Sequence, residues 1–363
     1  MTYPEPAVGE LHDLDGRTMA TPPSSWALQD VANFRDVGRT VNAYLGERRI
    51  REGVFFRSAR LDDATAEDRH TIAEDAGIKT VIDLRTKYVM SLRDQRHTST
   101  PVRPGRFRPV PCADKNSRSE HLKQAKKHQG KLAAAAGHDR PDDAVVQPPR
   151  IGGLDYHEIK ITGRAFEIYL LRQLSWWSLM RVCPYSQTVH LDKVADAETS
   201  KFLILFTFGY RMQALGILGR EVMLPRGLVG LGLATMDLSG AEIRETLLLY
   251  TSASPLPSVV HCTHGKDRTG LICALVLMIL DIPIDAVEHD YFLTDIALSH
   301  GLDQTLAELR EVGLPDDWAG TASNMITAIR DHLDERYGGL DGYLDHIGFT
   351  KADRCQVRDT LLY

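Results

Sequence analysis

The sequence contains few cysteines, and none has the spacing of a metal site. Its five cysteines lie far apart in 363 residues, and no pair forms Cys-x-x-Cys. This pattern excludes a zinc cluster of the ribbon type and a secreted disulfide framework. It indicates a reducing compartment. We therefore expect a cytoplasmic protein that needs neither a metal ion nor another cofactor.

Long apolar runs and an excess of basic residues are also missing. The longest apolar run, Leu271–Leu280, is about half as long as a membrane span requires. The first residues carry acids and prolines where a signal peptide would have a basic start and an apolar stretch. With 43 Lys and Arg against 49 Asp and Glu, the formal net charge is −6. We therefore expect no transmembrane segment and no nucleic-acid partner.

Two segments have too little apolar patterning to build a core. Residues 1–28 contain four prolines, and we expect a mobile N-terminal tail. Residues 113–150 are polar, and we expect a largely disordered or loosely helical insertion in one domain that spans 29–363. Between residues 115 and 131 this insertion holds six basic residues and one acid. A solvated charge run is the simpler interpretation, and weak contact with an anionic membrane surface is the alternative.

The remaining sequence alternates strand-like and helix-like patterns. Short apolar runs predict three strands, at residues 53–57, 79–84 and 258–261, and the run at 79–84 is also β-branched. A capping box at Thr65 predicts a helix that ends at Gly77, and a second box from Ser239 to Glu242 predicts a helix to about Tyr250. We interpret the glycine-rich stretch before the second helix as a flexible loop. The C-terminal third has the pattern of successive amphipathic helices. This order favours an α/β fold with a central, mostly parallel sheet flanked by helices.

The strongest chemical signal is the run HCTHGKDRTG at residues 261–270. A loop between the end of a strand and the start of a helix points backbone amides at one spot and forms an anion cradle. Cys262 lies at the mouth of this cradle, where the positive field lowers the pKa of a thiol. Arg268 can return to the loop centre and bind an oxyanion with two parallel hydrogen bonds. Together these features suit attack on phosphorus through a phosphocysteine intermediate.

The Cys-x5-Arg spacing followed by threonine is similar to the signature of the cysteine-dependent protein tyrosine phosphatases. Four motifs in order resemble the atypical tyrosine and dual-specificity phosphatases of bacteria and fungi: NFRD at 33–36, GVFFRS at 53–58, VIDLR at 81–85 and HCTHGKDRTG. The resemblance covers roughly residues 31–362 without the insertion. It implies a cysteine-phosphatase fold and metal-independent hydrolysis of phosphate monoesters on phosphotyrosine or mixed protein sites.

The resemblance also implies roles inside the loop. Cys262 would be the nucleophile and Arg268 would hold the phosphoryl oxygens. Backbone amides of the residues between them would bind the same oxygens, from Thr263, His264, Gly265 and Lys266. Thr269 would stabilise the departing thiolate. The positive charge of Lys266 is a feature shared with phosphoinositide phosphatases, so a phosphoinositide is the alternative substrate to a phosphorylated protein.

The general acid is ambiguous because the sequence has no Trp-Pro-Asp triplet. Asp237 lies 25 residues before Cys262, after the glycine-rich stretch, and a mobile loop could deliver it. Asp267 lies inside the loop, and we favour it slightly as the acid; its other possible role is to orient Arg268. The side chain of His264 either lines the pocket or faces solvent.

Four further residues are expected to support the loop. His261 would hydrogen-bond to the loop backbone and tune the thiol. Asp83 would form an ion pair under the loop or contact phosphate directly. Arg35 and Asp36, in the NFRD motif, are the other two supporting candidates.

Two other functions use a similar loop. The sulfur and arsenate chemistry of rhodaneses and arsenate reductases relies on loops that are shorter or lack the GKDRTG continuation. A non-catalytic phosphate-binding relative would usually have lost the cysteine or the arginine, and this chain has both.

Overall fold

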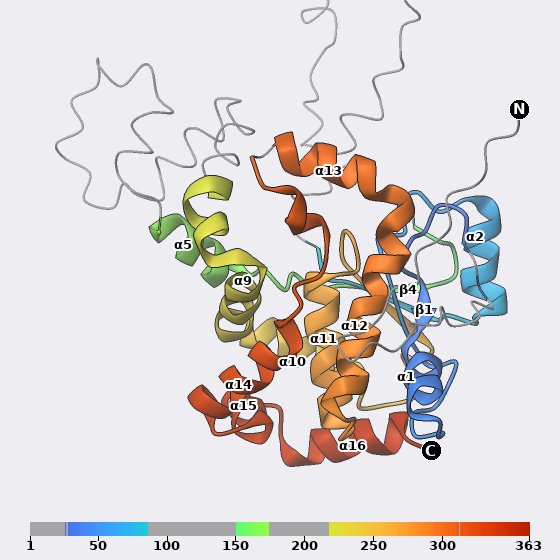
Figure 1. Ribbon diagram of the computed structural model, residues 1–363. Helices are drawn as coiled ribbons and strands as arrows, with labels where there is room; N and C mark the ends of the chain where they lie inside the picture. The colour runs from blue at the N-terminus through green and yellow to red at the C-terminus, as the bar shows by residue number, and fades with distance from the viewer. Residues whose placement is uncertain (1–25, 27, 86–149, 174–217, 312) are drawn as a thin grey trace, which may run out of the picture. The chain divides into compact units, whose positions relative to one another are not determined.

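The computed structural model describes residues 26, 28–85, 150–173, 218–311 and 313–363 (Figure 1). Nearly all of the expected tail and insertion lie outside the described residues, as does the basic stretch at 115–131. Within the described ranges, no helix combines the length and the apolar character needed to cross a membrane.

A five-stranded sheet forms the centre of the described structure. Its order is β1-β2-β5-β3-β4, and its strands are β1 (Arg35–Asp36), β2 (Phe55–Ser58), β3 (Thr80–Asp83), β4 (Asp155–Glu158) and β5 (Ser258–His261). Only β1 runs antiparallel to its neighbour. The expected mostly parallel sheet is confirmed. The three predicted strands are β2, β3 and β5, each within about two residues of its expected bounds.

Alternate residues of the central strands enter two different cores, as the pleat of a sheet requires. Phe55, Ile82 and Val260 belong to the larger core, which contains the C-terminal helices. Phe56 and Val259 belong to a smaller core on the other face, beneath the helical segment that follows Thr65. Burial on both faces explains why these strands are apolar without alternation.

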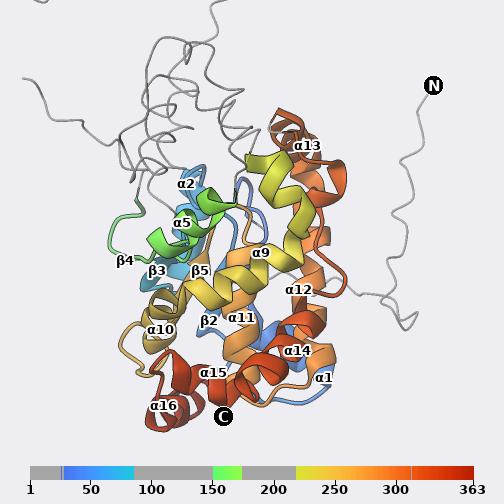
Figure 2. The same ribbon diagram turned by 90° about the vertical axis from the view of Figure 1, so that its left-hand side faces the viewer.

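Helices follow the strands and dominate the C-terminal part (Figures 1 and 2). The α-helices are α1 (Val37–Leu45), α2 (Ala66–His70), α5 (Arg164–Arg172), α9 (Leu224–Leu238), α10 (Gly240–Leu248), α11 (Asp267–Ile279), α12 (Ile284–Leu298), α13 (Leu302–Glu311), α14 (Met325–Tyr337), α15 (Leu340–His346) and α16 (Lys351–Leu361). Short turns of other helix types are η1 (Thr71–Asp75), η3 (Gly219–Met223), η4 (Ser299–Gly301) and η5 (Asp316–Ala319).

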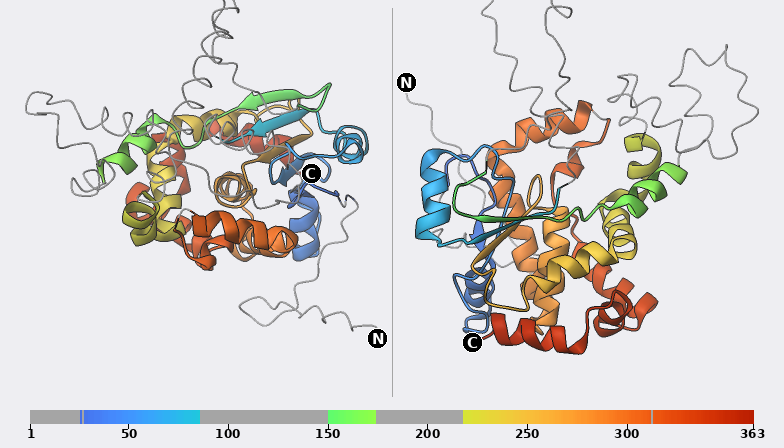
Figure 3. Two further views of the ribbon diagram at one scale, coloured as in Figure 1. Left: turned by 90° about the horizontal axis from the view of Figure 1, so that it is seen from above. Right: turned by 180° about the vertical axis from the view of Figure 1, so that it is seen from behind.

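Helix α11 lies at the centre of the larger core. It contacts β2, β5 and the helices α9, α10, α12 and α16. Figure 3 (left) shows this helix nearly end-on, with other elements around it. Every residue from Thr269 to Ile279 is buried. A helix that is apolar all round is stable only when it is enclosed in this way, and enclosure holds its N-terminus in a fixed place.

The structure corrects two local predictions. The glycine-rich stretch is not a flexible loop, because Gly230 and Gly232 lie within α9, and only Gly227 has non-helical geometry. Ser239 does precede α10, but its side chain makes no capping hydrogen bond. The carboxylate of Glu242 instead lies against Gly163, so the second capping box is wrong. The box at Thr65 is confirmed, with Asp68 as its partner.

Candidate active site

The loop Cys262–Lys266 connects the central strand β5 to the N-terminus of α11. Strand β5 pairs on both sides, with β2 and β3, so its end is fixed from two directions. Cys262 is buried, whereas Thr263 and His264 are partly exposed. The positive end of the α11 dipole therefore faces a loop that is anchored at one end and open to solvent in part.

All four carbonyl groups of residues 262–265 are bound by donors outside the loop. Cys262 accepts from Nδ1 of His261 (3.2 Å), Thr263 from the amide of Arg60 (3.2 Å), His264 from Nδ2 of Asn33 (3.1 Å), and Gly265 from Nδ2 of Asn33 (3.0 Å) and Nη2 of Arg57 (2.7 Å). Carbonyls that point outward leave the amides of the same peptide units pointing inward. The loop is thus a concave set of donors that suits an anion.

Gly265 is required by the close approach of β2 to the loop. Its φ is +65°, and a Cβ atom there would lie 2.2 Å from the carbonyl oxygen of Ser58. Both the left-handed backbone and the contact exclude a side chain. This contact presses the loop against the end of β2.

A buried ion cluster holds the outer side of the loop. Asp290 of α12 accepts from Nη1 of Arg57 at 2.5 Å and from Nε of Arg35 at 3.0 Å. Arg57 is completely buried and, through its second nitrogen, also binds Gly265. Burial alone would raise the pKa of Asp290, but the two arginine charges outweigh it and lower the pKa. Asp290 therefore stays ionised and keeps Arg57 directed at the loop.

The thiol of Cys262 has the electrostatics of a nucleophile. Burial alone would raise its pKa, but the positive charge of Arg268 and hydrogen bonds from the hydroxyl and amide of Thr269 outweigh burial, and the pKa is lowered. Within the described residues, the Thr269 hydroxyl has no oxygen or nitrogen partner. It is therefore available to the sulfur.

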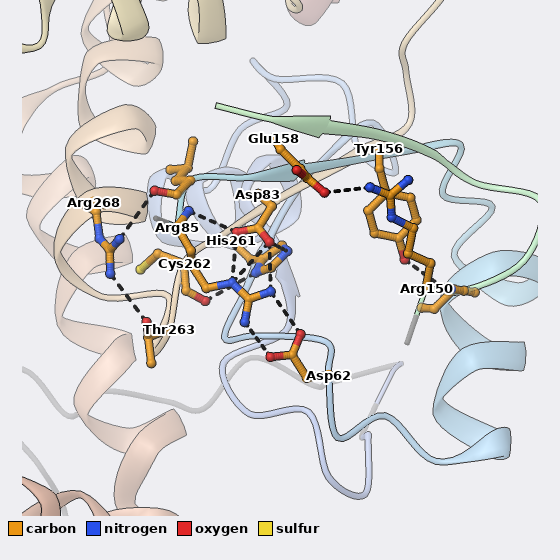
Figure 4. Close-up of polar contacts among 12 residues, drawn as sticks. Asp62, Asp83, Arg85, Arg150, Tyr156, Glu158, His261, Cys262, Thr263 and Arg268 are labelled. Carbon is orange, nitrogen blue, oxygen red and sulfur yellow. Dashed lines mark hydrogen bonds and ion pairs between the residues drawn. The ribbon is translucent and has the colours of Figure 1, made fainter. Parts of the chain in front are cut away.

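Among the described residues, the guanidinium of Arg268 has two long hydrogen bonds. Its Nη1 lies 3.4 Å from the carbonyl oxygen of Leu84, and its Nη2 lies 3.4 Å from the hydroxyl of Thr263. Figure 4 shows the sulfur of Cys262 on the side of Arg268. Long hydrogen bonds to neutral acceptors are easily exchanged for shorter bonds to an anion.

A second cluster lies under the loop and joins β3 to the turn before α2. Arg85 donates to both carboxylate oxygens of Asp83, at 2.7 to 3.1 Å, and also to Asp62 (Figure 4). Nε2 of His261 lies 3.9 Å from Asp83, and burial lowers the pKa of His261. A neutral His261 donates from Nδ1 to Cys262. Asp83 is thus placed in an ion pair with Arg85 beneath the loop.

The two candidate acids lie in different surroundings. Asp267 begins α11, directly after the loop, and its side chain is 44% exposed. Asp237 lies in the last turn of α9 and accepts from His332 (2.8 Å) and from the hydroxyl of Tyr337 (2.7 Å). It also pairs with Arg336 at 3.0 Å. The structure therefore places Asp267 directly after the loop, at the start of α11, and ties Asp237 to α14.

The remaining candidates occupy structural positions around the loop. Asp36 caps α1 and accepts from the amide of Gly53 at 2.6 Å. Burial raises the pKa of Asp36 to about 6. The Lys266 ammonium is buried and donates to the carbonyls of Trp318 and Gly320, both at 2.7 Å.

Sequence reasoning did not assign a role to Asn33, Arg57 or Asp290. Asn33 and Arg57 belong to motifs that were noted, and Asn33 has a φ of +61°, but their partner is the loop more than 200 residues away. A pattern along the chain carries no signal for such a pairing. Only the tertiary structure shows that these side chains hold the loop.

Comparison with known proteins agrees with this geometry. A family model described as "Tyrosine phosphatase family" matches residues 26–146 and 232–363, more than half of the chain. The triple specificity protein phosphatase PtpB of Mycobacterium tuberculosis is 30% identical over 139 residues, which is 34% of this chain and 50% of that protein. A tyrosine-protein phosphatase of Nostoc commune is 29% identical over 109 residues, 27% of this chain and 36% of that protein. The chain thus spans half or less of the length of these relatives. On the family match, whose two segments contain the loop and all the side chains that hold it, this chain belongs to the tyrosine phosphatase family.

Proposed function

We propose that this protein hydrolyses phosphate monoesters, with phosphotyrosine as the preferred group, through a phosphocysteine intermediate. The observation that carries the proposal is the thiol of Cys262, whose pKa is lowered by Arg268 and Thr269. It lies at the start of a loop in which the carbonyls of residues 262–265 all point outward. A thiolate and an anion cradle at one spot supply both the nucleophile and the binding energy for a phosphoryl group.

The first step transfers the phosphoryl group to sulfur. The Cys262 thiolate attacks phosphorus, the bond from phosphorus to the ester oxygen breaks, and this oxygen leaves with a proton from Asp267. The guanidinium of Arg268 and the loop amides bind the three equatorial oxygens, on which the negative charge is spread. In the second step water attacks phosphorus and gives its proton to Asp267. The S–P bond breaks, and inorganic phosphate and the thiolate are released.

Asp267 is the better supported of the two acids. Its side chain is 44% exposed and its carboxylate lies 3.8 Å from the Lys266 ammonium, whereas Asp237 is engaged by three side chains of α14. An acid must reach the leaving oxygen within hydrogen-bond distance, and Asp237 would have to leave all three partners to do so.

The burial of the sulfur favours phosphotyrosine over phosphoserine. Only 3% of Cys262 is exposed, so the phosphate must be carried inward on a long side chain. The aromatic ester of tyrosine extends further from a peptide than the ester of serine, and we expect phosphoserine peptides to react more slowly.

The test is turnover of a chromogenic aryl phosphate by the wild-type protein and by two cysteine variants. Cys262→Ser removes the nucleophile and should lower kcat by about 10³-fold or more, while binding of the ester by calorimetry persists. Cys355→Ser changes an exposed free cysteine on α16 and should leave turnover unchanged. Turnover by Cys262→Ser near the wild-type rate would exclude the phosphocysteine mechanism.

A further inference from the structure

Lys266 is the second cation of the loop, and its ammonium group is bound to backbone carbonyls outside the loop. Its side chain is only 4% exposed. Nζ donates to the carbonyl of Trp318 and to that of Gly320, each at 2.7 Å. The carboxylate of Asp267 lies 3.8 Å from the same nitrogen. The ammonium group thus has two hydrogen bonds to backbone carbonyls and one longer ion pair.

The two carbonyls that bind Lys266 belong to one short segment, Asp316–Thr321, which begins with the turn η5. This segment is bound a second time on its other side, where the amide and the hydroxyl of Thr321 donate to Asp295 of α12 at 2.7 and 2.6 Å. Trp318 is buried at 9% exposure. The segment therefore lies beside the loop and is tied to it through one lysine.

A second phosphate could bind Lys266 only if this arrangement broke. The buried carbonyl of Trp318 and the partly buried carbonyl of Gly320 would lose their donor, and an unpaired buried polar group costs about 1–3 kcal/mol. The strongest charges that act on the Cys262 thiol are those of Arg268 and Asp267. Arg268 is thus the loop cation that a substrate phosphate meets.

We propose that Lys266 is a positioning residue that fixes the segment Asp316–Thr321 against the phosphate-binding loop, and that the site recognises a single phosphate group. This inference rests on the proposed phosphatase function for its substrate class. The tether itself is independent of turnover. It assigns to Lys266 a different role from the binding of a second substrate phosphate.

The tether is tested first by proteolysis of the full chain. Chymotrypsin cleavage after Trp318, followed by mass spectrometry, reports local opening of the segment. Lys266→Met should speed this cleavage by about tenfold or more, because the two carbonyls lose their donor. Lys160→Met removes an exposed lysine that pairs with Glu167 and should cleave at the wild-type rate. Wild-type cleavage of Lys266→Met would overturn the tether.

A second measurement uses only the wild-type protein and decides the matter even where Lys266→Met does not fold. An amine acetylating reagent should modify Lys266 at least about tenfold more slowly than the exposed Lys160, since its ammonium is buried and bonded. Saturation with inorganic phosphate should not change the rate at Lys266. Fast labelling of Lys266 that phosphate suppresses would show that it binds ligand, and would overturn the proposal.

The substrate arm compares a chromogenic aryl phosphate with a short-chain phosphatidylinositol bisphosphate. Lys266→Met should lower kcat/KM for both by the same factor, within about twofold, because the segment and not a second phosphate contact is lost. A loss confined to the bisphosphate would overturn the single-phosphate assignment. If the wild-type protein hydrolysed neither ester, the proposed function would fail, while proteolysis and labelling would still judge the tether.

Discussion

At the scale of single residues, the shape of the loop depends on side chains that come from other parts of the chain. Asn33 donates to two successive loop carbonyls, and its left-handed backbone is one that asparagine tolerates better than most residues. Arg57 adds a third bond, and Asp290 keeps Arg57 in place. These three residues fix the direction of the loop amides, on which the proposed roles of Cys262 and Arg268 depend.

The two aspartates should separate clearly on mutation. Asp267→Asn should lower kcat by about 10²–10⁴-fold for esters with poor leaving groups, and much less for activated aryl phosphates, which leave without a proton. The basic limb of the pH–rate profile should disappear as well. Steady-state kinetics with two esters of different leaving-group pKa checks this.

Asp237→Asn is the matched variant, since it removes a carboxylate of the same kind from the end of α9. The variant loses the ion pair with Arg336 and the charge that strengthens the bonds from His332 and Tyr337. We expect a loss of about 1–3 kcal/mol of stability, with normal kinetics on both esters. If Asp267→Asn had normal kinetics and Asp237→Asn had impaired kinetics, the general acid would be Asp237 on α9.

At the scale of elements, the contact between β2 and the loop is the most sensitive point. Gly265→Ala would place a Cβ atom 2.2 Å from the Ser58 carbonyl, so the loop would have to shift. We expect loss of detectable turnover and of vanadate binding, measured by kinetics and calorimetry. Gly77→Ala is the control, because Gly77 also has a positive φ but no atom within 4 Å of the added Cβ. It should cost about 1 kcal/mol of stability and leave activity intact; equal effects of the two variants would contradict the contact argument.

The elements that follow local patterns could be predicted from the sequence. The predicted strands at 53–57, 79–84 and 258–261 correspond to β2, β3 and β5, and the capping box at Thr65 begins α2. The glycine-rich stretch was wrongly predicted to be a loop, because a glycine can also allow two helices to pack closely. In α9, a Cβ on Gly232 would lie 3.0 Å from the sulfur of Met325. Such a contact with α14 is invisible in the sequence of α9.

The same difference between local patterns and long-range contacts applies to the candidate site. Sequence patterning predicted the position of the loop, between the end of a strand and the start of a helix, because strand, cysteine, arginine and helix are consecutive. It could not predict where Lys266 points, since the partners of Lys266 lie 52 and 54 residues further along the chain. The order of residues along the chain predicts where Cys262 and Arg268 lie, whereas the contacts that hold their loop in place are long-range.

At the scale of the whole molecule, Asp36 links the pH of the solution to stability. Its pKa is about 6 in the folded protein, raised by burial from 3.8. The folded state therefore binds the proton more tightly than the unfolded state. The contribution of Asp36 to stability is full below pH 3.8 and is lost as pH rises through about 6. The difference of about two pKa units corresponds to about 3 kcal/mol.

Asp36→Asn should therefore change the pH dependence of stability. The variant loses one hydrogen bond at every pH, because an amide offers one acceptor oxygen in place of two. It also lacks a group that titrates at position 36. As pH rises from 4 to 7, the wild type loses stability from Asp36 and the variant does not, so the Tm of the variant should rise relative to that of the wild type. Thermal unfolding monitored by circular dichroism measures this. Glu47→Gln, at an exposed carboxylate, should show a constant difference, and a constant difference for Asp36→Asn would refute the assignment.

The side chains that hold the loop have a consequence for synthesis on the ribosome. Cys262 and Arg268 emerge after Asn33 and Arg57 but before Asp290, and well before Trp318 and Gly320. A nascent chain that has just exposed the complete signature therefore has Cys262 and Arg268 but lacks the anion that directs Arg57 and the carbonyls that anchor Lys266. The loop gains these supports only when residues 290–320 have been made, so the complete arrangement around Cys262 forms late in synthesis.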